Sequence, residues 1–182
     1  MEPEILKRLE AFLEQGTTTS FLRLREAMIA SPGYEPYTQT PEAVLTEGSF
    51  PDHATAMNTI RQMMGNWFLS PSFHHVLSYL HHKSGDDHLS RVEHELASRF
   101  IAGILSTGNG TEENPYLVLH TQDEYDLLDH LDKKRSVQAL IFKEPQVALD
   151  RLTCEDGTVL WFDVTVPYGR LVQRQNSATE GA

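Results

Sequence analysis

The stretch that decides the fold runs from Phe73 to Leu119 and reads FHHVLSYLHHKSGDDHLSRVEHELASRFIAGILSTGNGTEENPYLVL. Apolar residues recur at helical spacing on both sides of Gly85, which predicts two helices joined by a short turn. A polar, glycine-rich break follows, and then residues 116–120 form an apolar run typical of a β-strand. The stretch therefore joins a helical first half to a mixed second half.

Upstream of this stretch, the apolar spacing predicts only helices. Gly16 marks the end of the first helix, and Ser31-Pro32-Gly33 marks the end of the second. The further predicted helices cover residues 41–47, 52–66, 71–83 and about 86–105. Two tyrosines lie in the loop YEPYTQTP, where we expect them to close over the end of a core.

Downstream, turn signals and β-prone runs alternate. Thr121 with Glu124 matches a capping box for a short helix. Three further strands are expected at residues 136–142, 147–154 and 158–166, with Asp156-Gly157 as a two-residue hairpin turn between the last two. We therefore predict an α+β fold, in which an N-terminal antiparallel helical stack precedes a small antiparallel β-sheet with one helix.

This pattern divides the chain into three parts. Residues 1–108 form a helical lobe, residues 109–172 form a β-α-β-β-β lobe, and residues 173–182 form a disordered tail. A length of 182 residues also suits one compact domain made of two lobes.

Composition limits the kinds of partner. The chain carries 15 Lys and Arg against 26 Asp and Glu, a formal charge of −11. Nucleic acid is then an unexpected partner, because binding it requires cations that neutralise phosphates. No apolar run approaches the ~18 residues of a membrane span. The start of the chain lacks the features of a secretory signal, and one cysteine cannot form an intrachain disulfide, so we expect a cytoplasmic protein.

Histidines concentrate in the central helices. On the helix over residues 71–83, His75 and Tyr79 fall opposite the apolar stripe. On the next helix, Glu93 falls inside the apolar stripe, where a carboxylate needs a partner, such as a histidine of the preceding helix, or an open edge that reaches water. His94 follows it. We expect His75, Tyr79, Glu93 and His94 to form a binding site; the alternative is that the histidines are solvated or lie at the edge of the core.

No catalytic, cofactor or metal motif is complete. The paired histidines are seven residues apart, about 10 Å along a helix, which is too far to share one zinc ion. Both His-Glu-x-x-His and Gly-x-Ser-x-Gly are absent, and Cys154 lies in a predicted strand, where a cysteine is usually inert. We therefore assign no catalytic residue, no metal and no cofactor.

A set of motifs carries a family resemblance. These are FLRLREAMIASPGYEPY near the start, then ILSTGNGT, NPYLVL, DEYDLL, VQALI and DGTVLWFDVTVPYGRL. Together they cover roughly Phe12 to Leu171 and resemble the bacterial domain-of-unknown-function family 4919. In that family two histidines of the central helices are typical, and His75 and His94 are the nearest matches. The helices over residues 52–105 are also similar to a tetratricopeptide unit. The resemblance implies a fold but no activity.

Our functional expectation is a non-enzymatic cytoplasmic binding or adaptor protein that acts through protein–protein contacts. A specific form is an immunity-type protein that masks a basic partner, whose encounter an acidic surface would speed. The alternative is a small hydrolase with a His/Glu pocket between two helices. A third possibility is a structural subunit that oligomerises through the methionine-rich helix over residues 52–66.

Overall fold

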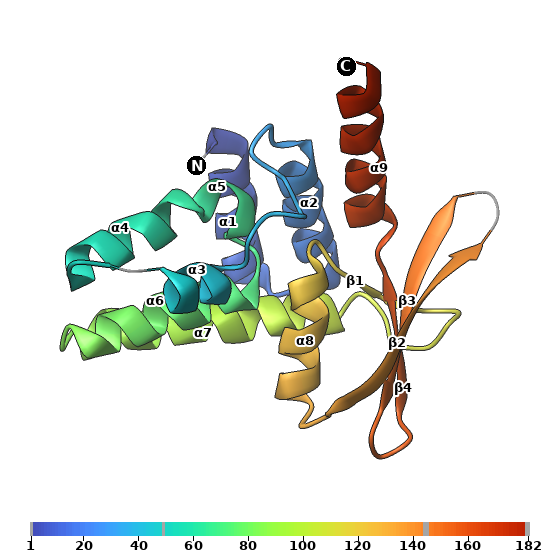
Figure 1. Cartoon of the computed structure of the whole chain (residues 1–182). Coiled ribbons are helices and arrows are strands. Elements are labelled where there is room, and N and C mark those ends of the chain that lie inside the picture. Colours follow the sequence, from blue (N-terminus) through green and yellow to red (C-terminus); the bar gives the residue numbers. More distant parts are fainter. Residues whose placement is uncertain (1, 49, 144–145, 181–182) are drawn as a thin grey trace. The chain divides into compact units, whose positions relative to one another are not determined.

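The computed structural model describes residues 2–48, 50–143 and 146–180 (Figure 1). The fold is α+β, as predicted. The chain divides into two compact units. The first unit comprises Thr38–Gly103 together with the chain up to Tyr34. The second comprises Glu35–Tyr37 and the chain from Ile104 onward.

Helices build the first unit. They are α1 (Pro3–Gln15), α2 (Thr18–Ala30), α3 (Pro41–Glu47), α4 (His53–Gln62), α5 (Met64–Trp67), α6 (Pro71–Lys83) and α7 (Asp87–Leu105). Gly16 ends α1 in the left-handed conformation, with φ of 59°, as its position predicted. The predicted helix over residues 52–66 is instead two helices, because the Met63 N–H bonds to the Ile60 carbonyl and tightens the turn.

Helices α6 and α7 form an antiparallel pair around the turn at Gly85. Ser78 Oγ donates to the Ser90 carbonyl at 2.8 Å, and His74 meets Glu93 nearer the start of α6 and the middle of α7. As the residue number rises on α6 it falls on α7, which defines the antiparallel register. This pair places the predicted site residues on facing segments of two helices.

The core of the first unit is aromatic. The rings of Phe12, Phe21, Phe68 and Phe100 contact one another at centroid distances of 5.4–6.0 Å. Gly103 has to be glycine, because a Cβ there would lie 2.4 Å from the Phe21 ring. The predicted inner stripe of α7 holds only in its second half: Ala97, Phe100 and Ile101 are buried, whereas Leu89 and Val92 are exposed. In the loop that contains two tyrosines, Tyr34 is 1% exposed and Tyr37 is partly exposed.

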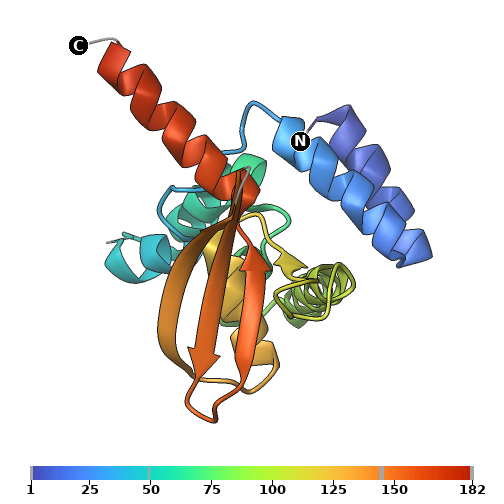
Figure 2. The same cartoon turned by 90° about the vertical axis from the view of Figure 1, so that its right-hand side faces the viewer.

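The second unit contains β1 (Tyr116–Leu117), α8 (Thr121–His130), β2 (Arg135–Lys143), β3 (Val147–Cys154), β4 (Val159–Asp163) and α9 (Thr165–Glu180). Its sheet has the order β1-β4-β3-β2 (Figure 2). The prediction of a purely antiparallel sheet is wrong, because β1 pairs parallel with β4. The prediction rested on hairpin turns, which orient only consecutive strands, and α8 separates β1 from β2.

Helix α8 begins differently from its prediction. The side chain of Asp123, not of Glu124, caps the helix: its Oδ2 accepts the N–H groups of Leu119 and His120 at 3.0 and 2.9 Å. These bonds also end β1 early, because they take the backbone of residues 119–120 away from the sheet. Glu124 is thereby left to turn toward the strands.

The hairpin between β3 and β4 is one residue longer than predicted. The Gly157 N–H bonds to the Cys154 carbonyl, and the Cys154 N–H bonds to the Thr158 carbonyl. Gly157 has φ of 85°. This is the three-residue loop in which a turn is followed by a left-handed glycine, so Gly157 acts one position later than a two-residue turn requires.

Helix α9 occupies Thr165–Glu180, where an extension of β4 and then a disordered tail were predicted. Asp163 Oδ1 accepts the N–H of Thr165, which turns the chain from β4 into α9. Pro167 was expected to close the strand, but it falls in the first turn of α9, where its missing N–H costs nothing. Helix α9 covers most of the predicted tail; residues 181–182 lie outside the described residues.

Candidate functional site

Three of the four predicted binding residues lie on the outer side of the α6–α7 pair. His75, Tyr79 and His94 are exposed, and the ring centroids of His75 and His94 are 5.9 Å apart. Tyr79 is 51% exposed, one turn beyond His75 on α6. The structure thus brings His75 together with His94 across the two helices, and with Tyr79 along one helix.

Glu93, the fourth residue, points to a different histidine. Its Oε2 lies 2.7 Å from Nδ1 of His74, while Nε2 of His74 lies 2.7 Å from the Phe68 carbonyl oxygen. The His74 ring is 1% exposed and the Glu93 side chain 18%. Both readings of Glu93 therefore hold in part: it pairs with a histidine of the preceding helix, and it keeps some contact with water.

Sequence reasoning missed His74 because it sits next to His75 and carries no distinguishing motif. The signal that was available is the apolar stripe of α6: residue 74 follows Phe73 and precedes Val76 and Leu77, and all of these are buried. The rings of Phe68, Phe73 and Phe100 surround the imidazole at centroid distances of 5.1–5.3 Å. His74 is thus a core residue that fixes Glu93.

A groove lies beside this pair, between α3 and α6. Its walls are lined by Glu42, Leu45, Thr46, His75, Val76 and Tyr79, and its volume is about 520 Å³. Helix α3 is held locally by Thr40, whose Oγ1 accepts the Ala43 N–H at 3.2 Å, and by Pro41 at its first position. The groove includes two predicted site residues, His75 and Tyr79.

One wall of this groove carries an incompletely satisfied carboxylate. Glu42 Oε2 is buried and has no hydrogen-bond partner among the described residues. The other wall contributes the exposed ring of Tyr79, with Lys83 Nζ 5.3 Å from the ring centroid. Leu45 and Val76 supply apolar surface between them. A groove of this kind suits a ligand that offers an apolar group and a hydrogen-bond donor or positive charge.

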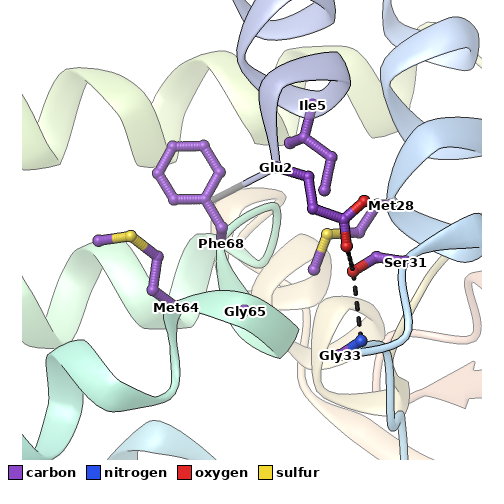
Figure 3. A pocket seen from close by; sticks show the side chains of 8 residues that line it. All are labelled: Glu2, Ile5, Met28, Ser31, Gly33, Met64, Gly65 and Phe68. Carbon is purple, nitrogen blue, oxygen red and sulfur yellow. Dashed lines mark hydrogen bonds between the residues drawn. The ribbon is translucent and has the colours of Figure 1, made fainter.

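A second cleft of the first unit, of about 400 Å³, has satisfied polar groups (Figure 3). Ile5, Met28, Met64 and Phe68 give it apolar walls. At its polar side, Ser31 Oγ donates to Glu2 Oε1 at 2.9 Å and accepts the Gly33 N–H at 3.2 Å (Figure 3). The Glu2 carboxylate already accepts a hydrogen bond from Ser31. This cleft therefore offers a ligand less to bind than the α3–α6 groove, where a carboxylate oxygen has no hydrogen-bond partner among the described residues.

The second unit holds a buried carboxyl pair that sequence reasoning did not identify. Gln138 Nε2 lies 2.8 Å from Asp150 Oδ2 and 3.3 Å from Glu124 Oε2, so one amide bridges α8, β2 and β3. Glu124 is fully buried and Asp150 is 5% exposed. Burial raises the pKa of Glu124 well above its usual range, and the charge of Asp150 and a hydrogen bond between the two carboxyls raise it further.

The surroundings of the pair explain how it is tolerated. Glu124 Oε1 is buried and has no hydrogen-bond partner among the described residues, which favours the neutral, protonated carboxyl over the charged one. Arg135 donates to Gln138 Oε1 at 2.7 Å and to the Tyr125 hydroxyl at 2.8 Å, and it opposes the rise in the pKa of Glu124. Because both carboxyls are buried, no substrate reaches them in this conformation, and the pair reads as part of the core.

Other reactive groups are not arranged for catalysis or metal binding in the described residues. No group of three or more His, Cys, Asp or Glu side chains in residues 2–48, 50–143 and 146–180 is placed to hold a metal ion. Cys154 is buried, and burial raises the pKa of its thiol, which disfavours the thiolate that a nucleophile requires. Within the same residues, no helix has the length and apolar character needed to cross a membrane.

Comparison with known proteins returned no match, whether to a family model, a curated protein or a solved structure. The resemblance to family 4919 therefore stays a prediction from the motifs.

Proposed function

We propose that this chain is a non-enzymatic binding or adaptor protein that receives a segment of a protein partner in the α3–α6 groove. The observation that carries the proposal is the composition of that groove, where an exposed Tyr79 ring and apolar side chains face a carboxylate with an unsatisfied oxygen. Exposed aromatic side chains of this kind are enriched at the centres of protein interfaces.

The charge of the chain supports a basic partner. A formal charge of −11 would steer a positively charged protein toward it, and that contribution weakens as salt screens the charges. An immunity-type protein that masks a basic partner is the specific form of this proposal. We also propose a cytoplasmic location, in keeping with a single cysteine that is buried and reduced.

The alternative function, a small hydrolase, requires His75, His94 and Glu93 to converge in a concave pocket. Glu93 instead bonds to the buried His74, and His94 is not among the residues that line the α3–α6 groove. The geometry therefore favours binding over hydrolysis.

Site-specific crosslinking tests the proposal. A photoreactive phenylalanine analogue at Thr46, an exposed residue of the groove, should capture one protein from native lysate in a 1:1 adduct. The yield should fall when Tyr79→Arg is added and when salt is raised. The same analogue at the exposed Asn58 on α4 serves as the matched control. Equal capture at both positions, or an adduct unaffected by Tyr79→Arg, would contradict the proposal.

A further inference from the structure

We propose that the groove selects a lysine or arginine side chain of the partner, with the cationic head at Glu42 and the aliphatic stem against Leu45, Val76 and Tyr79. This inference rests on the proposed function, and it names the chemical group that the groove recognises.

The carboxylate of Glu42 lacks a partner of opposite charge among the described residues. Its carboxylate forms no ion pair and accepts no side-chain hydrogen bond among the described residues, and its Oε2 is buried. A partly buried carboxylate without a partner is unfavourable, because burial removes water that protein groups do not replace. A cation supplied by a partner would compensate that loss.

The apolar surface of the groove suits the methylene groups of a lysine or arginine side chain. Leu45, Val76 and the Tyr79 ring line the same groove as Glu42. Lysine and arginine combine a charged head with three or four methylene groups, so they can bury the stem on apolar surface while the head reaches a carboxylate. An acidic or short polar side chain lacks one of these two features.

We expect the groove to accept lysine and arginine about equally. The two parallel hydrogen bonds of an arginine fork need both carboxylate oxygens accessible. Oε2 of Glu42 is buried, so an arginine fork cannot reach both oxygens in this conformation. A single contact suits an ammonium as well as a guanidinium, so we expect the two residue types to bind with similar affinity.

Lys83 lies one turn after Tyr79 on α6. Its Nζ lies 5.3 Å from the centre of the Tyr79 ring, so a positive charge already stands at the rim of the groove. That charge repels an incoming cation. Replacing Lys83 with methionine keeps the stem and removes the repulsion, and the variant should bind a cationic ligand more tightly.

The test uses the full chain and four dipeptide probes, Ac-Leu-Lys-NH2, Ac-Leu-Arg-NH2, the uncharged isostere Ac-Leu-norleucine-NH2, and Ac-Leu-Glu-NH2. Methyl resonances of Leu45 and Val76 report binding during titration. The lysine and arginine probes should bind within about threefold of each other, and about fivefold more tightly than norleucine. Glu42→Gln should erase that difference, and Lys83→Met should increase it.

Failure of this inference is distinguishable from failure of the proposed function. If norleucine binds as tightly as lysine and Glu42→Gln changes nothing, the cation preference is refuted, while crosslinking at Thr46 still tests the groove. If no probe perturbs the groove and Thr46 captures no partner, both proposals are refuted. Glu42 is only partly buried, so Glu42→Gln should fold, and circular dichroism checks this.

Discussion

His74 and Glu93 are paired within the first unit, with Nδ1 of the imidazole 2.7 Å from Oε2 of the carboxylate. The other ring nitrogen of His74 lies 2.7 Å from a carbonyl oxygen, that of Phe68, which can only accept. Nε2 must therefore carry a hydrogen, and a second hydrogen must lie between Nδ1 and Glu93. This contact ties the middle of α7 to α6 and, through the Phe68 carbonyl, to the segment before α6.

Replacement of Glu93 by leucine should destabilise the first unit by about 3 kcal/mol, because the buried His74 then loses the partner of a polar ring nitrogen. Glu93→Gln should cost less, about 1–2 kcal/mol, since its amide N–H can donate to Nδ1 of a His74 ring that carries its hydrogen on Nε2. Urea unfolding followed by Trp67 fluorescence in a Trp161→Phe background measures the effect on this unit alone.

The control for Glu93 is Glu95, two residues further along α7. Glu95 Oε1 accepts from Arg99 Nε at 2.9 Å on the surface, where such pairs contribute little. Glu95→Gln should therefore change the unfolding free energy by less than about 0.5 kcal/mol. Equal effects of Glu93→Gln and Glu95→Gln would mean that the His74 contact does not stabilise the unit.

The ring nitrogens of His74 provide a second prediction that is independent of stability. Nitrogen-15 spectra of the imidazole at neutral pH should show hydrogen on Nε2 and a strongly hydrogen-bonded proton at Nδ1. The exposed His88 is the comparison, and its nitrogens should exchange their protons with water rapidly. A bare Nε2 on His74 would contradict the contact with the Phe68 carbonyl.

The ends of many helices were predictable, because glycine and proline determine the backbone conformation at their own positions. Gly16 ends α1 and the Pro71 start of α6 lies where the sequence placed it. The capping of α8 was assigned to Glu124 because it follows Thr121 by three residues, as in a capping box, but the helix begins one residue earlier and Asp123 takes that role. The parallel pairing of β1 with β4 and the helix after β4 depend on contacts between segments far apart, which no local signal encodes.

The candidate site was predictable only in part for the same reason. Helical spacing placed His75 and Tyr79 on the exposed side of α6, and both lie there. The spacing does not say which neighbouring element faces that side, so the role of Glu42 on α3 was not foreseen. Nor does it separate His74 from His75, which are adjacent in sequence but lie inside and outside the unit.

Gly157 should be intolerant of a side chain, because its φ of 85° is a conformation that residues with a Cβ rarely adopt. Gly157→Ala should destabilise the second unit by about 1 kcal/mol. Gly169→Ala is the matched control: this glycine lies in helix α9 with open space around it, so alanine there should be neutral or stabilising. Trp161 fluorescence in a Trp67→Phe background reports this unit, and equal effects would contradict the assigned turn.

Glu124 should make the second unit less stable as pH rises. Its pKa is raised in the folded state by burial, by the charge of Asp150 and by their hydrogen bond, relative to about 4.5 for an unperturbed glutamate. The stabilising contribution of the protonated form is complete below that unperturbed value. It is lost progressively as pH rises through the folded pKa, because the unfolded chain then releases a proton that the folded chain retains.

Glu124→Gln removes this dependence, because an amide donates to Asp150 without titrating and its oxygen still accepts from Gln138. The variant should match the original chain near pH 4 and exceed its stability at pH 8–9, as measured by urea unfolding with Trp161 fluorescence. Glu112→Gln, which removes the partly exposed partner of Lys143, should leave the slope with pH almost unchanged. A Glu124→Gln variant that keeps the full pH dependence would show that the proton is held elsewhere in the second unit.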